Sequence, residues 1–247
     1  CNEKHLLETD MKQILLQKVP NAKITSVPNE GRKGPVHAVS FIFDEIDDSE
    51  EVIVSYCDYG TVWNYKMFLE TMRSNSADGG IASYIGFHPH MLGSDNYAFM
   101  THNAMWVTDI QEKQPFTNNK MEEYASNGTY YFRTGAVLKQ YFQKLMDLDM
   151  NLKGEFYVSL VYKLMIQDNL KVRIFEIEKM LQWGTPYDLE VYNMWSNYFS
   201  NIIKEQPQFI DRLNTTTILP MAGAGSRFSK KGYKDPKPLL DVNGLPM

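Results

Sequence analysis

The chain has few cysteines, no dense run of basic residues and no long apolar segment, and each absence excludes a class of protein. Only Cys1 and Cys57 occur in 247 residues, too few for a disulfide framework, so we expect a reducing, cytoplasmic location. The formal net charge is −5, with lysines and arginines dispersed, which argues against a nucleic-acid partner or a charged membrane surface. No apolar stretch reaches the length that spans a bilayer.

The composition is that of a globular protein. Apolar residues make up 43% and charged residues 22%, which is typical of a folded chain with a sizeable core. The sequence starts at Cys1 and stops at Met247 in the middle of a motif. We therefore expect it to be a piece of a longer polypeptide.

Short apolar strands alternate with amphipathic helical segments along the first 200 residues. The run EVIVSYC at 51–57 predicts a buried strand, and apolar residues recur at helical spacing on both sides of it. Helices are predicted at 4–18, 35–43, 62–75, 121–125, 135–149, 156–167 and 182–203. This rhythm is typical of a three-layer α/β fold with a mostly parallel sheet, in which ligands bind at the carboxyl ends of the strands.

The most informative stretch covers residues 215–247, TTTILPMAGAGSRFSKKGYKDPKPLLDVNGLPM. It opens with a β-branched and apolar run that predicts a buried parallel strand. The glycines of the next loop permit backbone N–H groups to approach phosphate oxygens. Arg227 and Lys237 follow as two cations that could neutralise a polyphosphate. The loop residues are Ala222, Gly223, Ala224 and Gly225.

Other phosphate-binding loops fit this stretch less well. A Walker A loop requires Gly-Lys-Ser/Thr, whereas Gly225 is followed by Ser226 and Arg227. A dinucleotide fingerprint requires a third glycine where Phe228 stands. A Gly-rich turn that binds nothing is the plain alternative.

Residues 215–247 resemble the signature of the sugar-1-phosphate nucleotidyltransferases, the pyrophosphorylases that make nucleotide sugars. The resemblance lies in the predicted strand and in the motifs G-A-G-x-R-F, P-K-P-L and V-x-G-x-P that follow it. The resemblance extends over almost the whole chain. It implies the nucleotide-diphospho-sugar transferase fold and transfer of a nucleotidyl group from an NTP to a sugar 1-phosphate or similar phosphorylated molecule. It further implies that the Gly-rich loop binds the NTP, that Arg227 and Lys237 neutralise its phosphates, and that Mg²⁺ is the cofactor.

Asp58 follows the predicted strand at 51–57, at the end where ligands gather. The resemblance implies that its carboxylate binds the catalytic Mg²⁺. A strand-end aspartate can instead cap a helix, here the one expected from about Val62.

Three further segments resemble substrate-binding parts of the family. The loop at 30–35, with Glu30 and Gly34, would lie along the nucleobase. Glu112 and Lys113 would contact the sugar hydroxyls and phosphate; the alternative is a solvated charge pair at a strand end. The remaining pair, Asn127 and Gly128, would line the acceptor pocket. His88 and His90 could bind a metal, but no further ligand stands at a recognisable spacing.

The segment W-G-T-P-x-D-L at 183–189 is similar to the end of the family's catalytic core, with one departure. Gln182 stands where many members carry the aspartate that is the second metal ligand, and a neutral amide is a poorer ligand for Mg²⁺. Glu178 is a candidate substitute on proximity in sequence alone.

The order of the motifs is shifted, because the first strand and phosphate loop of the family come last here. We expect a core over residues 1–200 that lacks its first strand, a linker over 201–214, and that strand with its loop over 215–247. A circular permutant and a slice of a tandem array both fit. The segment at 215–220 would pair with the strand at 52–57, within one chain or by strand exchange in a homo-oligomer.

Two other functions stay open. A glycosyltransferase of the same fold would require an Asp-x-Asp metal motif, whereas the strand ends Cys57-Asp58-Tyr59. A catalytically weak domain that binds nucleotide sugars and regulates a partner is compatible with Gln182.

Overall fold

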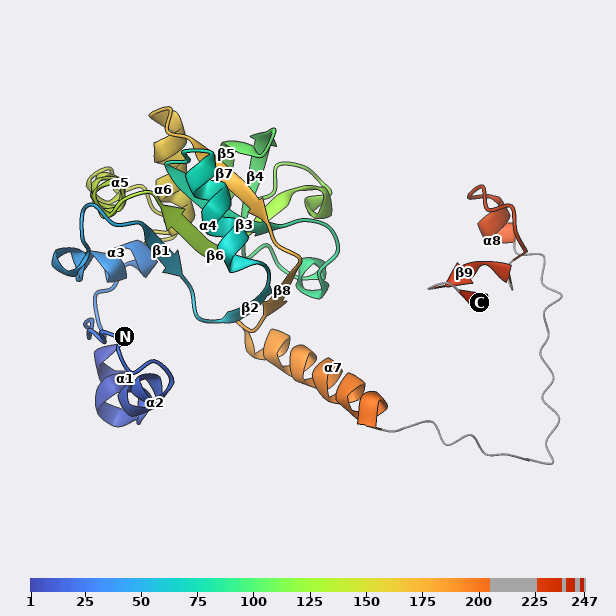
Figure 1. Ribbon diagram of the computed structural model, residues 1–247, viewed down its shortest axis with the longest axis horizontal. Helices are drawn as coiled ribbons and strands as arrows, with labels where there is room; N and C mark the ends of the chain where they lie inside the picture. Colours follow the sequence, from blue (N-terminus) through green and yellow to red (C-terminus); the bar gives the residue numbers. More distant parts are fainter. Residues whose placement is uncertain (205–225, 237–238, 243–244, 247) are drawn as a thin grey trace. The chain divides into compact units, whose positions relative to one another are not determined.

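The structure is a computed structural model that describes residues 1–204, 226–236, 239–242 and 245–246 (Figure 1). The chain divides into two compact units, Cys1–Phe199 and Ser200–Met247. Within the described residues, no helix combines the length and the apolar character needed to cross a bilayer.

A six-stranded sheet forms the centre of the first unit, in the order β1-β6-β3-β7-β5-β4. Its strands are β1 (Val52–Ser55), β3 (Gly79–Tyr84), β4 (Ala98–Asn103), β5 (Trp106–Glu112), β6 (Tyr124–Phe132) and β7 (Val172–Glu176). A separate antiparallel ribbon joins β2 (Tyr59–Val62) to β8 (Lys179–Gln182).

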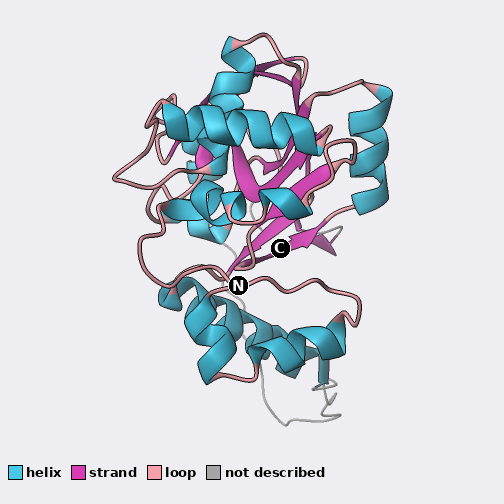
Figure 2. Cartoon of the chain, turned by 90° about the vertical axis from the view of Figure 1, so that its left-hand side faces the viewer, coloured by secondary structure: helices cyan, strands magenta, loops and turns pink. Residues whose placement is uncertain are grey.

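Helices cover both faces of the sheet, so the expected three-layer α/β architecture is confirmed (Figure 2). Alternate residues of β6 point to opposite sides, with Tyr130 and Phe132 in one core and Tyr131 in the other. The first core lies under α3 (Gly34–Ser40), α5 (Gly135–Asp147) and α6 (Val158–Gln167); the second lies under α4 (Tyr65–Ser74).

The sheet is mixed, and the expectation of a mostly parallel sheet is wrong for the described strands. β3 and β7 pair in parallel, whereas the other pairs that involve the six strands are antiparallel. One cause is the tight hairpin between β4 and β5, where Ala104 and Met105 both adopt positive φ, 48° and 69°. Such a turn normally shows Asn-Gly in the sequence. Because Ala104 and Met105 stand there instead, the sequence did not predict β4.

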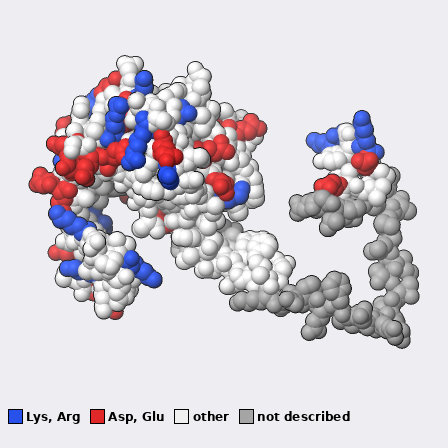
Figure 3. All heavy atoms as spheres, in the orientation of Figure 1, with Lys and Arg blue, Asp and Glu red and all other residues white. Residues whose placement is uncertain are grey.

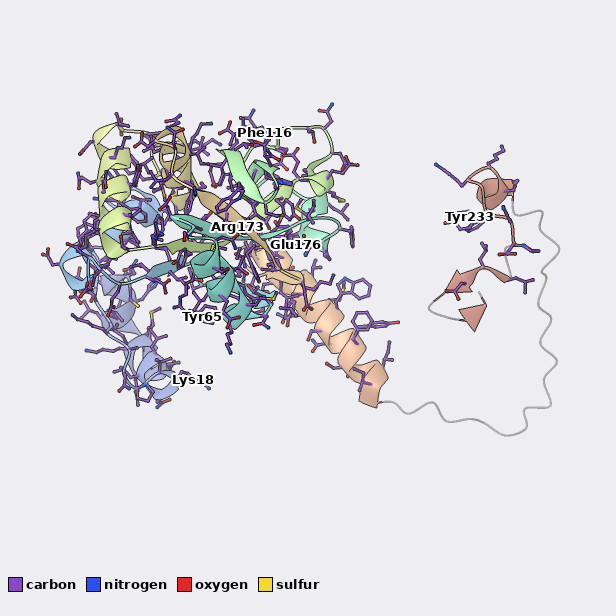
Figure 4. The ribbon with its side chains drawn as sticks, turned by 45° about the horizontal axis from the view of Figure 1, so that its top comes forward. Lys18, Tyr65, Phe116, Arg173, Glu176 and Tyr233 are labelled. Carbon is purple, nitrogen blue, oxygen red and sulfur yellow. The ribbon has the colours of Figure 1, made fainter. Side chains whose placement is uncertain are left out.

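β7 shows how the sheet uses polar residues at its surface (Figure 4). The Arg173 guanidinium lies 5.0 Å from the centre of the Trp106 ring on β5. Glu176 accepts a hydrogen bond from the Tyr124 hydroxyl of β6 at 2.5 Å. These contacts join three strands.

Two predicted helices differ from those observed. Residues 4–18 form two short helices, α1 (Glu3–Glu8) and α2 (Met11–Lys18), neither with a buried residue. The helix expected at 121–125 is a 3₁₀ turn (Lys120–Glu122) followed directly by β6. Other 3₁₀ turns span Phe43–Glu45 and Pro89–Leu92.

α7 (Pro186–Lys204) begins four residues later than predicted, because Gln182 ends β8; Thr185 caps the helix, and its hydroxyl bonds both the N–H and the carboxylate of Asp188. From Val191 to Ile203 it carries no charged residue, and this part of the surface is white in Figure 3. In the second unit the structure describes α8 (Ser226–Ser229) and the antiparallel pair β9 (Asp241–Val242) and β10 (Leu245–Pro246). The strand predicted at 215–220 lies outside the described residues.

The start of α5 provides a test of this packing. Gly135 donates its N–H to the Glu50 carbonyl at 2.8 Å, and a Cβ there would lie 2.1 Å from the backbone oxygen of Asp47. Gly135→Ala must therefore move backbone, and we expect it to lower the free energy of unfolding by roughly 1–3 kcal/mol. Gly93→Ala is the control, because its Cβ would meet its nearest atom at 3.4 Å. Urea unfolding of both variants measures the difference; equal stability would contradict this account.

Candidate functional site

Asp58 lies at the bend between β1 and β2, and the β2–β8 ribbon brings Gln182 to it. Tyr59 is paired with Gln182, and the Asp58 carbonyl accepts a hydrogen bond from the Trp183 N–H at 3.0 Å. The two side chains converge on Gly184, where an added Cβ would lie 2.8 Å from Asp58 Oδ2 and 2.9 Å from Gln182 Nε2. A side chain at residue 184 would have to displace the carboxylate and the amide, so the glycine leaves the space between them open.

The Asp58 carboxylate is exposed and uncommitted. It makes no hydrogen bond and no salt bridge within the described part of the chain. It does not cap α4, because that helix begins later than predicted and Asn64 is its N-cap, with Oδ1 accepting from the Met67 N–H at 3.0 Å. The capping alternative is therefore wrong for this helix.

The donor set at this corner fits a Mg²⁺ ion held mainly by ligand oxygens. Among the described residues, no three His, Cys, Asp or Glu side chains converge on a common point. Mg²⁺ usually retains waters and binds proteins through one or two carboxylates plus substrate phosphates. Asp58 would be the charged ligand, with the Gln182 amide beside it. Glu178 is no substitute, because it lies at the other end of the ribbon, where its N–H bonds the Val62 carbonyl at 3.1 Å.

Glu112 ends β5 and is partly withdrawn from solvent. Its Oε2 accepts a hydrogen bond from the Ser159 hydroxyl at 2.5 Å. Burial raises the pKa of the Glu112 carboxyl, while the bond from Ser159 opposes that rise. No salt bridge joins Glu112 to Lys113 within the described residues, and each side chain has another hydrogen-bond partner.

Lys113 is held by other partners. Its backbone adopts φ +56°, uncommon for a residue with a side chain, and its N–H donates to the Tyr97 carbonyl at 2.9 Å. Its Nζ donates to the Tyr157 hydroxyl at 2.6 Å and lies 4.3 Å from the centre of that ring. The Tyr157 hydroxyl in turn donates to Glu155.

Asn127 and Gly128 lie within β6, and their interactions are with the protein. Asn127 is buried; its amide N–H donates to the Thr61 hydroxyl at 2.9 Å, and its Oδ1 accepts from the Thr129 N–H at 2.9 Å. Gly128 has φ +94°, and a Cβ there would lie 3.0 Å from the Tyr56 ring and 3.1 Å from the Tyr59 ring. Asn127 therefore joins β6 to Thr61, and Gly128 allows the Tyr56 and Tyr59 rings to approach the strand.

Tyr56 links the Asp58 corner to Glu112. It precedes Asp58 by two residues, and its N–H donates to the Gly128 carbonyl at 3.1 Å. Burial, followed by the nearby Glu112 charge, raises the Tyr56 pKa, and Asp58 adds to the rise. Burial also raises the pKa of Tyr97, and the nearby Asp188 and Asp58 charges raise it further. The raised pKa keeps both phenols neutral near the Asp58 carboxylate.

The loop that contains Glu30 and Gly34 lies against residues 155–156. Gly34 has φ +86°, and a Cβ there would lie 2.8 Å from the Phe156 nitrogen. The Phe156 N–H donates to the Lys33 carbonyl at 2.8 Å, and its carbonyl accepts from the Val36 N–H at 3.1 Å. This loop is thereby attached to the segment that holds Lys113. Glu30 is exposed.

The phosphate-loop residues are only partly described. Arg227 lies in α8 (Ser226–Ser229). Ala222, Gly223, Ala224, Gly225 and Lys237 lie outside the described residues.

The two histidines of the 88–97 loop form an aromatic cluster. His90 Nε2 lies 3.0 Å from the Tyr84 hydroxyl, and its ring packs 4.9 Å from Tyr97. Burial and the neighbouring His88 lower the pKa of His90 to about 4. No third ligand joins them within the described part of the chain.

Sequence reasoning missed Tyr56, Tyr97, Tyr157 and Ser159. Tyr56 could have been found from its place in the strand that leads to Asp58. The other three belong to no motif, because their position depends on contacts between segments far apart in the sequence.

Neither a protein-family model nor a curated protein matches the chain. Solved structures do. A nucleoside-diphosphate-sugar pyrophosphorylase from Vibrio cholerae is 18% identical with a TM-score of 0.56, over 75% of this chain and 76% of that one. A UDP-glucose pyrophosphorylase solved with UDP-glucose is 14% identical with a TM-score of 0.57, over 79% and 74%. An inositol-1-phosphate CTP transferase from T. maritima is 14% identical with a TM-score of 0.52, over 76% and 71%.

At these identities the likeness shows the fold. The chain has the mixed α/β fold of these neighbours, which are sugar-phosphate nucleotidyltransferases and nucleotide-sugar pyrophosphorylases. This agrees with the fold implied by the sequence motifs.

Burial of Glu112 predicts a pH dependence of stability. Between the usual carboxyl pKa of 4.5 and the raised one, the folded chain binds more protons than the unfolded chain. The free energy of unfolding therefore falls as pH rises through this window. Glu112→Gln keeps an acceptor for Ser159 and removes the titration, so the variant should gain stability relative to the wild type as the pH rises above the usual carboxyl pKa of 4.5.

Thermal melts of both proteins at a series of pH values measure the relative gain. Glu178→Gln, on an exposed side chain, is the control. A constant difference between Glu112→Gln and wild type at all pH values would show that burial does not raise the Glu112 pKa.

Proposed function

We propose that the chain transfers a nucleotidyl group from an NTP to a sugar 1-phosphate or similar phosphorylated small molecule, with release of pyrophosphate. The observation that carries the proposal is the uncommitted Asp58 carboxylate, which meets Gln182 at Gly184 at the end of β1. Exposed carboxylates without partners are free to bind a cation or a cationic complex. The fold of the solved neighbours supports the same reaction class.

In this proposal Arg227 and Lys237 bind the triphosphate and the leaving pyrophosphate, and the loop at 222–225 surrounds it. The phosphate of the acceptor attacks the α-phosphorus in line, so the protein's task is to position two anions and offset their repulsion. Mg²⁺, when bound, supplies charge neutralisation between donor and acceptor phosphates. The Asp58 carboxylate would hold it.

Glu112 and Lys113 serve the acceptor. Lys113 directly follows β5, and its ammonium would pair with the acceptor's phosphate. Glu112 lies beside it with Oε2 bonded to Ser159, which leaves the other carboxylate oxygen to accept from a sugar hydroxyl. Glu30 and Gly34 would contact the nucleobase, and Asn127 and Gly128 shape the pocket through Tyr56 and Thr61.

The β1 edge supports a place for the predicted strand at 215–220. Among the described strands β1 pairs with β6 alone. Val52, Ile53 and Val54 are half-buried, so an apolar strand edge is left open. We propose that residues 215–220 pair there, in the same chain or in a second copy.

A domain that binds nucleotide sugars without turnover is the second candidate, and Gln182 favours it because the corner has one carboxylate where two are usual in the resembled family. The two candidates differ in pyrophosphate release. Assays with UTP, CTP or dTTP and with glucose 1-phosphate or inositol 1-phosphate, each with Mg²⁺, separate a catalyst from a binder.

Asp58→Asn tests the carboxylate. The change removes the charge that a hard cation prefers, and it breaks no hydrogen bond of the carboxylate within the described residues. Pyrophosphate release should fall about 100-fold or more, with an unchanged melting temperature. Asp44→Asn, on an exposed aspartate, is the control. Full activity in Asp58→Asn would remove Asp58 from the mechanism.

Arg227→Ala and Lys237→Ala test the phosphate loop. A charge-assisted contact contributes roughly 1.5–3 kcal/mol, so each variant should bind NTP about 10- to 100-fold more weakly by isothermal titration. Lys12→Ala, in α2, is the control for loss of one positive charge. Wild-type affinity in both Arg227→Ala and Lys237→Ala would disprove the assignment.

A further inference from the structure

We propose that Tyr157 and Glu155 are positioning residues that hold Lys113 ready for the acceptor's phosphate and attach it to the loop at 30–34. The inference rests on the proposed function, since it gives Lys113 an acceptor phosphate to meet. We call the three side chains of Lys113, Tyr157 and Glu155 the lysine clamp.

The hydrogen bonds of the lysine clamp run in one direction. The Lys113 ammonium donates to the Tyr157 hydroxyl at 2.6 Å, and that hydroxyl donates to Glu155. The phenol therefore stands between a cation and an anion and presents each with the group it requires. Burial raises the Tyr157 pKa, and the bond to Glu155 raises it further, so the phenol retains the proton that it donates.

The aromatic ring adds a second restraint on the ammonium. Lys113 Nζ lies 4.3 Å from the centre of the Tyr157 ring, within range of a cation–π interaction. An exposed lysine otherwise samples many rotamers, and losing that freedom on binding weakens affinity. A lysine already held at one place binds a phosphate with less loss of entropy.

The backbone of Lys113 is restrained as well. Its positive φ is uncommon for a residue with a side chain, and such conformations concentrate at functional sites. The Tyr97 carbonyl holds its N–H at 2.9 Å. Neighbouring residues therefore fix both the backbone and the ammonium of Lys113, whereas a lysine that only contacts solvent would have neither restraint.

The lysine clamp is also joined to the loop expected to contact the nucleobase. Gly34 packs so closely on residues 155–156 that an added Cβ would lie 3.1 Å from Glu155 Cβ and 2.8 Å from the Phe156 nitrogen. Two backbone hydrogen bonds connect Phe156 to Lys33 and Val36. A displacement of this loop must move Glu155, and with it the phenol that holds Lys113.

Tyr157→Phe is the main test, because it keeps the ring and removes the hydroxyl. With a sugar 1-phosphate that the wild type turns over, the KM for that acceptor should rise about three- to tenfold, the size of one ordinary hydrogen bond, because the hydroxyl positions the lysine and does not itself contact the phosphate. The kcat and the KM for NTP should change less than about twofold, because the positioned lysine would contribute equally to binding of the acceptor in the ground state and in the transition state. Tyr141→Phe is the matched control, because its hydroxyl bonds Asp168 at 2.9 Å.

A double-mutant cycle separates positioning from a structural effect. In a Lys113→Met background, Tyr157→Phe should cause no further rise in acceptor KM, because the group it positions is gone. Equal effects of Tyr157→Phe with and without Lys113 would overturn the proposal.

A second readout does not require activity. The rate of reductive methylation of Lys113, followed by mass spectrometry on the full chain, should rise several-fold in Tyr157→Phe and also in Gly34→Ala, which has no direct contact with the lysine. Unchanged rates in Tyr157→Phe would show that no lysine clamp exists. Absence of turnover in the wild type with altered methylation in the variant would instead reject the proposed function and leave the lysine clamp standing.

Discussion

The register of the β2–β8 ribbon is the constraint on which the candidate site depends. Pairing of Tyr59 with Gln182 places Asp58 beside the W-G-T-P turn. A four-residue ribbon has little stability of its own, and it is held by large side chains at its edges. The Trp183 ring lies against Gly60, where a Cβ would be 2.9 Å away, and 5.3 Å from the Tyr192 ring of α7. A shift of this pairing by one residue would separate the carboxylate from the amide.

The long apolar and amphipathic segments could be predicted from sequence, and the short ones could not. The strand before Asp58 and the helices at 135–149 and 156–167 follow from hydrophobic periodicity. β2 and β8 are four residues each and lack a strong alternation, so only their mutual pairing makes them strands. The helix wrongly expected at 121–125 has a related cause. Glu123 is buried and accepts from the N–H groups of Phe116 and Thr117 at 2.8 and 2.6 Å, so its carboxylate stabilises a loop instead of a helix surface.

The same division holds for the site. Asp58 and Glu112 stand at strand ends, where a sequence rule points to ligands, and the structure leaves Asp58 free and Glu112 half-covered. The partners of Lys113 could not be derived, because Tyr157 and Glu155 lie more than 40 residues away in sequence and meet it only through the packing of α6 on β5. The family resemblance implies that Asn127 lines the acceptor pocket, whereas in the structure its side-chain amide joins β6 to Thr61.

The single carboxylate at the Asp58 corner has a consequence for the order in which ligands would bind. A hard divalent cation loses several waters when it enters a protein site, and one exposed carboxylate beside a neutral amide offsets little of that cost. A triphosphate supplies several charged oxygens at once. Under the proposed function, the cation would therefore enter already bound to the nucleotide, and affinity of the free protein for Mg²⁺ would be weak. Gln182 would then change which species is recognised, the metal–nucleotide complex in place of the bare ion, without requiring a different reaction.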